Sequence, residues 1–133
     1  MAGIVDIKVL LRDMTPVLDT HAYVFCTKAV RTLTDEIVRL EPTGTFLEAE
    51  GMTLILLKTK ADEVGFMYEG VFRKITLEIH SSLEAVGLTA AFSKVLTDHG
   101  ISANVVAGYY HDHIFVPEAK AEQAMDALRS LSR

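Results

Sequence analysis

The stretch VFRKITLEI at residues 71–79 alternates apolar and polar side chains, and this alternation limits the fold more than any other feature of the sequence. A period of two predicts a β-strand with one buried face and one wet face. From Leu83 to His99 the apolar residues recur instead at helical spacing, and Gly100 follows where a helix would stop. The change of period predicts a strand followed by a helix.

Two further strands and a second helix are predicted after this pair. ISANVVA at 101–107 and HIFVP at 113–117 are rich in strand-forming residues, and GYYHD joins them. Apolar residues between Ala121 and Leu131 then predict a closing helix, with acids early and arginines late, as the helix dipole favours. With one preceding strand from the first half, this order predicts an α+β fold of the ferredoxin-like βαββαβ type, an antiparallel sheet with helices on one face.

The first half is predicted to supply more strands and helices. Residues 3–13 have the apolar spacing of a helix, and AYVFCTK at 22–28 has the composition of a strand. Two extended runs meet around Glu50-Gly51, where glycine accepts a positive φ in a hairpin turn, and TKADEVG at 59–65 predicts one or two helical turns. Because no Pro/Gly/Ser-rich linker separates the halves, we expect them to share a continuous sheet or an interface.

The composition argues against several classes of protein. The formal net charge is -5 and Lys and Arg are not clustered, so no nucleic-acid partner is expected. No apolar run is long enough to cross a bilayer, and the first residues include acids where a secretory signal would be apolar. We therefore expect a cytoplasmic protein without a membrane partner. The single cysteine, Cys26, has apolar neighbours and is expected to be buried rather than reactive.

The segment HSSLEAVG at 80–87 lies where the predicted strand ends and the helix begins. The first amides of a helix have no acceptor within the helix and carry partial positive charge, so a small carboxylate would satisfy them. Gly87 has no side chain to block a ligand, and Ser81 and Ser82 add hydroxyl donors. The same residues also have a purely structural interpretation, because Ser81 and Glu84 have the spacing of a capping box and glycine permits close packing.

Residues 70–131 resemble ACT domains, the ligand-sensing modules of enzymes in amino-acid metabolism. VGLTAAF at 86–92 opens the helix, HGISANVV at 99–106 is similar to the family's Gly-Ile-x-x-Asn strand entry, and HIFVP is similar to its third strand. The whole chain is similar to small bacterial proteins made of two tandem ACT-like modules. Residues 1–69 would then be a degenerate first module, because they have a helix before the strands and no second VGLTAAF.

The resemblance implies a regulatory module that binds an amino acid or similar carboxylate around this loop, at a module or subunit interface. It implies no catalytic residues and no cofactor. Glu84, or Asp112 from the facing hairpin, would receive an α-ammonium group. Asn104 matches a family asparagine, although asparagine also suits a strand entry by bonding local backbone. The predicted ligand-binding residues are Ser81, Ser82, Leu83, Glu84, Val86, Gly87, Leu88, Asn104 and Asp112.

The stretch GYYHDH at 108–113 is interpreted as a hairpin tip rather than a metal site. His111 and His113 would project to one side of an extended chain, a spacing that suits zinc, but a closed site needs further ligands and nothing in the sequence fixes another histidine nearby. We therefore predict no metal. Tyr109 and Tyr110 would present surface for a protein contact, and the histidines would make assembly respond to pH.

Three functional hypotheses follow from the sequence. The leading one is a non-enzymatic regulator whose ligand changes its own assembly, as a homodimer or higher homo-oligomer, or the activity of a partner metabolic enzyme. The second is a scaffold that keeps the fold and associates through open sheet edges without a ligand. The third is an enzyme that uses His111, Asp112 and His113, although the sequence has no nucleophile with a positioned base and no phosphate-binding glycine loop.

Overall fold

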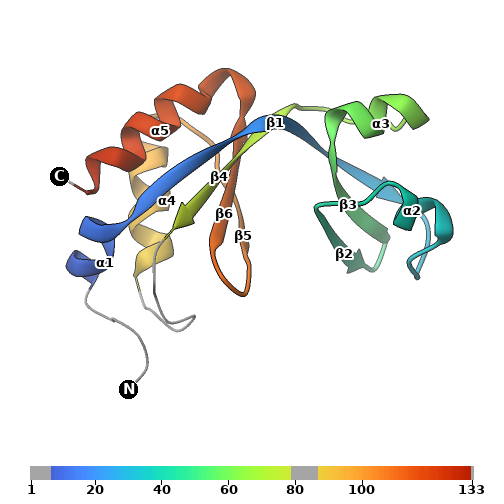
Figure 1. Ribbon diagram of the computed structural model, residues 1–133, viewed down its shortest axis with the longest axis horizontal. Coiled ribbons are helices and arrows are strands. Elements are labelled where there is room, and N and C mark those ends of the chain that lie inside the picture. The colour runs from blue at the N-terminus through green and yellow to red at the C-terminus, as the bar shows by residue number, and fades with distance from the viewer. Residues whose placement is uncertain (1–6, 79–86, 133) are drawn as a thin grey trace. The chain divides into compact units, whose positions relative to one another are not determined.

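The computed structural model describes residues 7–78 and 87–132, which form two compact units (Figure 1). Unit 1 contains the chain up to Thr20 and from Arg73 onward, and unit 2 is the continuous segment from His21 to Phe72. The elements in chain order are α1 (Ile7–Asp13), β1 (Thr15–Lys28), α2 (Asp35–Arg39), β2 (Gly44–Glu48), β3 (Gly51–Leu57), α3 (Lys58–Val64), β4 (Phe72–Glu78), α4 (Leu88–Asp98), β5 (Asn104–Ala107), β6 (Asp112–Pro117), the 3-10 helix η1 (Glu118–Lys120) and α5 (Ala121–Ser130).

The order strand, helix, strand, strand, helix occurs twice along the chain. The first series is β1, α2, β2, β3 and α3, and the second is β4, α4, β5, β6 and α5. Two such series are the pattern of tandem ferredoxin-like modules. The compact units cut across this order, because residues 15–20 of β1 belong to unit 1 and the rest of β1 belongs to unit 2. The predicted modules 1–69 and 70–133 follow the two series of elements and not the two compact units. The division of the chain into these modules stays a prediction.

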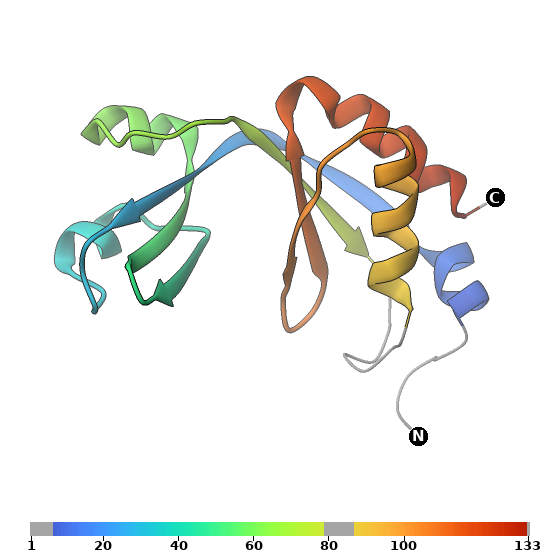
Figure 2. The same cartoon turned by 180° about the vertical axis from the view of Figure 1, so that it is seen from behind.

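In unit 1 the strands are hydrogen-bonded in the order β1-β4-β6-β5. This is the order of a ferredoxin-like sheet in which β1 stands in the place of the fourth strand. Ile75 of β4 and Ile114 of β6 belong to one buried cluster with Phe92 of α4 and Leu128 of α5. Both helices therefore cover the same face of the sheet (Figure 2), and the predicted ferredoxin-like fold is confirmed.

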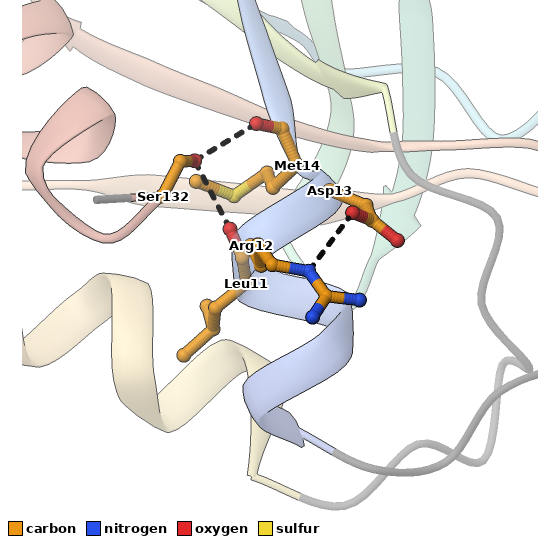
Figure 3. Close-up of polar contacts among 5 residues, drawn as sticks. All are labelled: Leu11, Arg12, Asp13, Met14 and Ser132. Atoms are coloured by element: carbon orange, nitrogen blue, oxygen red, sulfur yellow. Dashed lines mark hydrogen bonds and ion pairs between the residues drawn. The ribbon is translucent and has the colours of Figure 1, made fainter.

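The C-terminal end of unit 1 is tied to α1. The hydroxyl oxygen of Ser132 lies 3.0 Å from the carbonyl oxygen of Leu11 and 3.0 Å from that of Met14 (Figure 3). Because the hydroxyl has one hydrogen, it shares this donor between carbonyls at the end of the helix. Leu10 and Met14 are buried in the core of unit 1, so α1 packs as part of that unit.

In unit 2 the strand order is β2-β3-β1. β2 and β3 form the predicted hairpin, in which Glu48 pairs with Gly51 and the φ of Gly51 is 151°. Thr34 caps α2 by accepting a hydrogen bond from the Ile37 amide at 3.3 Å, and Gly65 ends α3 in the left-handed conformation. The core of this unit combines side chains of β1 and β3 with those of both helices: Val24, Cys26, Ile37, Leu40, Met52, Leu54, Leu56 and Ala61.

Two elements of the structure differ from the sequence-based expectation. β1 begins at Thr15, whereas the sequence indicated a strand only over 22–28. Pro16 and the polar residues after it do not have the sequence pattern of a strand. Proline is nevertheless tolerated near the start of an edge strand, and β1 is at one edge of the sheet of unit 1. α2 was not predicted, because five residues are too few to show a helical period.

We expect Gly51→Ala to destabilise unit 2. An added Cβ would lie 2.7 Å from the carbonyl oxygen of Lys28, and the positive φ adds backbone strain, so the expected loss is about 1–3 kcal/mol in the free energy of urea unfolding. Gly65→Ala is the matched control, since Gly65 also has a positive φ but its added Cβ would meet nothing within 4 Å. A Gly51→Ala protein as stable as the control would contradict the clash.

Candidate ligand-binding site

The predicted site begins where β4 ends and α4 starts. The structure describes the last residue of β4, Glu78, and the two residues Gly87 and Leu88 at the start of α4. It also describes the more distant candidates Asn104 and Asp112. The remaining predicted residues and the predicted capping box lie outside the described residues: Ser81, Ser82, Leu83, Glu84 and Val86.

Gly87 is the N-cap residue of α4. It is exposed, and its φ of 92° lies in the left-handed region. A glycine has no side chain that can accept hydrogen bonds from the first helical amides, and a Cβ built at this position would meet nothing within 4 Å. Within the described part of the chain, the start of α4 is therefore open to an acceptor from outside the helix.

Leu88 anchors the same helix end. Its side chain is 3% exposed and belongs to the buried cluster of unit 1. The amide of Ala91 donates a hydrogen bond to the carbonyl oxygen of Gly87 at 3.0 Å, which fixes the first turn. Leu88 is thus able to offer a ligand its backbone amide but not its side chain.

Asn104 and Asp112 lie at opposite ends of the β5–β6 ladder. Asn104 is paired with Phe115 and Asp112 with Ala107, which separates the two ends by about 10 Å along the strands. The hairpin turn before Asp112 lies at the same end of unit 1 as the start of α4 (Figure 2). The structure therefore brings Asp112 to the end of the sheet that holds Gly87, and Asn104 to the other end.

The side chain of Asn104 makes a local contact. Its amide donates to the carbonyl oxygen of Phe115 across the ladder at 3.5 Å. This is the kind of backbone bond by which asparagine suits a strand entry. A direct role of Asn104 in ligand binding stays a prediction.

Asp112 is partly withdrawn from water. Burial raises the pKa of its carboxyl group, and the neighbouring His113 acts in the opposite direction. A partly desolvated carboxylate gains more from a nearby cation than a fully hydrated one does. The side chain of Asp112 is therefore chemically suited to an ammonium group.

Sequence analysis missed a polar cluster on the sheet of unit 1. The ammonium of Lys74 lies 3.4 Å from the carboxylate of Asp19, and these side chains are 19% and 21% exposed. Beside them, the hydroxyl of Thr76 lies 2.9 Å from Nδ1 of His113. The alternation in VFRKITLEI did place Lys74 and Thr76 on one face, but Asp19 belongs to the part of β1 that the sequence did not indicate as a strand.

Metal and nucleophile chemistry have little support among the described residues. They contain no group of three or more His, Cys, Asp or Glu side chains that could hold a metal ion. The ring centroids of His111 and His113 are 6.5 Å apart, and the rings are nearly perpendicular. Cys26 is buried as predicted, and burial raises the pKa of its thiol, which disfavours the nucleophilic thiolate.

None of the helices in the described chain combines the length and the apolar character that a membrane span requires.

Among the described residues, unit 2 has shallow hollows that are lined in part by α2, and the two described next are not lined by any predicted site residue. One, of about 480 Å³, is lined by Glu36, Arg39, Leu40, Glu63 and Val64. The other, of about 380 Å³, is lined by Leu33, Ile37, Val38, Pro42, Thr43, Gly44 and Thr45.

Comparison with known families defines the class of protein. Models of the ACT domain match residues 2–73 and residues 69–130. The chain therefore belongs to the ACT domain family and carries two tandem matches that together span almost all of it. ACT domains are regulatory rather than catalytic modules, and they generally bind small molecules and form oligomers.

Solved structures of other proteins are similar to this chain. A protein of unknown function from Vibrio cholerae, described as a possible transport protein, is 52% identical over 95% of both chains, with a TM-score of 0.87. The regulatory subunit of aspartate kinase from Thermus flavus is 10% identical to this chain. The match covers 90% of this chain and 97% of the subunit, with a TM-score of 0.61. The second likeness shows the fold alone. No curated protein sequence matches the chain.

Gly87 and Gly100 allow a matched test of the space at the start of α4. Both have a positive φ, 92° and 69°, and neither has an atom within 4 Å of an added Cβ. Replacing either one by alanine should lower the free energy of urea unfolding by a similar amount, about 1–2 kcal/mol, from the left-handed backbone alone. A much larger loss for Gly87→Ala than for Gly100→Ala would show that protein atoms fill the space beside Gly87.

Proposed function

We propose that this protein is a non-enzymatic regulator that binds an amino acid, or a similar small carboxylate, at the start of α4. Binding would change its own assembly, as a homodimer or higher homo-oligomer, or the activity of a partner metabolic enzyme in the cytoplasm. The proposal requires no cofactor. The observation that carries it is the start of α4 at Gly87, which no side chain of the described residues caps or covers, in a chain that belongs to the ACT domain family.

A carboxylate suits the start of α4 electrostatically. The first amides of a helix lack internal acceptors and lie at the positive end of the helix dipole. The first turn of α4 contains no acidic side chain that would compete for these donors, and Gly87 leaves room for an incoming group. Each charge-assisted hydrogen bond to the ligand would contribute about 1.5–3 kcal/mol when it is shielded from water.

An α-ammonium group would find a partner in Asp112. This side chain starts β6, at the end of the sheet where α4 begins, and burial raises the pKa of its carboxyl group. A cation beside Asp112 would offset the free energy that the partly desolvated carboxylate loses with its hydration. Opposite charges at the two poles of the site would favour zwitterionic amino acids over simple carboxylic acids.

Regulation by this site requires two states with different affinities for the ligand. A ligand that contacts both states equally shifts neither assembly nor activity. The exposed Gly87 and the solvent-facing hairpin tip leave this end of unit 1 accessible to a second chain or another protein. The fold shared with the regulatory subunit of an aspartate kinase supports a regulatory role of this kind.

A thermal-shift screen of the twenty amino acids tests the proposal. A ligand at a hundredfold excess over its Kd should stabilise the folded protein by about 2.7 kcal/mol, because it binds the folded state and not the unfolded chain. We expect an upward shift in Tm with one amino acid or a few related ones. The absence of a shift with all twenty would contradict binding of an amino acid.

The same glycine pair serves as the control for the binding site. Gly87→Ala should abolish or strongly reduce the ligand-induced shift, because its methyl group occupies the approach to the helix amides. Gly100→Ala, at the other end of α4, should retain the shift. Equal ligand responses in both variants would place the ligand elsewhere.

A ligand-free scaffold is the second candidate function, and the sheet edges favour it. β5 is one edge strand of unit 1 and β2 is one edge strand of unit 2, and unpaired edge strands invite pairing between chains. Tyr109 and Tyr110, at the hairpin tip, are each 80% exposed and stack edge to face, with centroids 5.0 Å apart. Aromatic side chains of this kind are enriched in protein interfaces.

Light scattering with and without the best ligand of the screen separates the two functions. A regulator that acts through assembly should change its mass when the ligand is added, whereas a scaffold should associate equally in both conditions. A thermal shift without a change in mass would favour control of a partner enzyme. Association without any thermal shift would favour the scaffold.

A further inference from the structure

The β5–β6 hairpin of unit 1 brings several titratable groups together. His111 lies in the turn, and Asp112 and His113 begin β6. In the order β4-β6-β5, β6 lies between the other two strands, so it attaches the hairpin to the rest of the sheet. β5 carries no titratable side chain. On the other side of the hairpin, β4 supplies Lys74, which is paired with Asp19 of β1, the strand beyond β4.

His111 brings a second imidazole ring close to His113. Nδ1 of the His111 ring is buried and has no hydrogen-bond partner among the described residues. The ring centroids of His111 and His113 are 6.5 Å apart, and the rings are nearly perpendicular. The turn of the hairpin is therefore packed around both rings.

The surroundings of the His113 ring disfavour its protonated, positively charged form. Its Nδ1 bonds to the hydroxyl of Thr76 at 2.9 Å, and an added Cβ at Gly108 would lie 3.4 Å from its Nε2, so the ring packs against the turn. Burial lowers the pKa of His113, and the positive charges of Lys74 and His111 lower it further. The carboxylate of Asp112 acts in the opposite direction.

The positive charge of Lys74 is fixed in place. Its ammonium is 3.4 Å from the carboxylate of Asp19, and both side chains are about four-fifths buried. The backbone carbonyl of Asp19 also accepts hydrogen bonds from Arg73, at 3.1 Å and 2.6 Å, which holds this part of β1 beside β4. A protonated His113 would therefore share the sheet face with a cation that its own ion pair prevents from moving away.

We propose that the β5–β6 hairpin is an acid-sensitive element: below neutral pH, proton uptake by His113 increases the frequency with which the hairpin separates from β4. Opening would displace the exposed pair Tyr109 and Tyr110 at its tip and free the backbone groups of β6. The proposal concerns the hairpin alone and does not depend on a bound ligand.

The direction of the effect follows from proton linkage. Between the lowered pKa of folded His113 and its ordinary value of about 6.5, the open hairpin binds more protons than the closed one. The closed form is therefore stable above this window and loses stability as the pH falls through it. Each unit of difference in pKa corresponds to about a tenfold change in the opening equilibrium.

Asp112 contributes with the opposite sign. Burial raises the pKa of its carboxyl group, so the closed hairpin holds a proton on Asp112 at a pH where the open one has released it. The contribution of Asp112 therefore favours the closed form as the pH falls below that raised pKa. The variant Asp112→Asn removes this stabilisation of the closed form. The acid-induced opening should therefore stay the same or become larger in this variant.

Amide hydrogen exchange between pH 7.5 and 5 tests the proposal. After correction for the intrinsic pH dependence of exchange, the opening equilibrium of the amides that link β6 to β4 should rise as the pH falls, while that of the β2–β3 ladder in unit 2 changes much less. His113→Gln should remove most of the rise. His99→Gln is the matched control, because His99 is exposed at the end of α4, and it should leave the rise unchanged.

Direct NMR titration of the imidazole groups gives a second measurement that needs no variant. The His113 ring of the unaltered protein should titrate below the value of an exposed histidine. A normal titration of His113 would overturn the proposal, and so would an equal acid-induced rise in His113→Gln and the unaltered protein. Loss of protection in both ladders together would also overturn it, because that result indicates general acid unfolding.

Discussion

The register of a single strand, β1, is the constraint on which both units depend. Its later residues pair with β3, from Tyr23 opposite Leu57 to Lys28 opposite Met52, and its earlier residues supply the edge of the sheet in unit 1. Successive side chains of a strand face opposite sides, so a slip of one residue would turn Val24 out of the core of unit 2. The same slip would turn Leu18 away from the core of unit 1.

The two faces of the sheet in unit 1 have different roles. Ile75 and Leu77 point into the cluster that holds α4 and α5, and this packing fixes where α4 begins. The alternate residues Lys74 and Thr76 meet Asp19 and His113 on the other face. The alternation of side chains along β4 therefore serves both faces. One set packs against α4, where the candidate ligand site begins, and the other set forms the polar cluster on the sheet of unit 1.

Much of this fold could be predicted from local patterns in the sequence. The alternation in β4 and the helical period of α4 arise from burial of one face, and each extends over enough residues to be recognised. The first part of β1 could not, since Pro16 and Asp19 are typical of a loop and only pairing with a distant strand makes this segment extended. The short helix α2 depends on the Thr34 cap and on burial of Ile37, not on a repeating pattern.

The candidate site stays a prediction, and the sequence indicated the positions of its parts unequally. A glycine before a helix indicated an open N-terminus, and the structure gives Gly87 a left-handed backbone with no described atom within 4 Å of an added Cβ. The sequence offered Asn104 and Asp112 as partners in one site, but the antiparallel ladder separates them. The Lys74–Asp19 pair was not predictable, because its members come from strands that become neighbours only in the folded sheet.

The contact between Ser132 and the end of α1 has a consequence for folding during synthesis. Residues 21–72 of unit 2 are continuous, so this unit can close while the ribosome is still adding the second half of the chain. Unit 1 combines α1 and the first part of β1 with the second half of the chain, so its core cannot be completed until that half has been synthesised. Synthesis from the N-terminus thus favours closure of unit 2 before unit 1, and apolar side chains of α1 such as Leu10 lack their core partners in the interval.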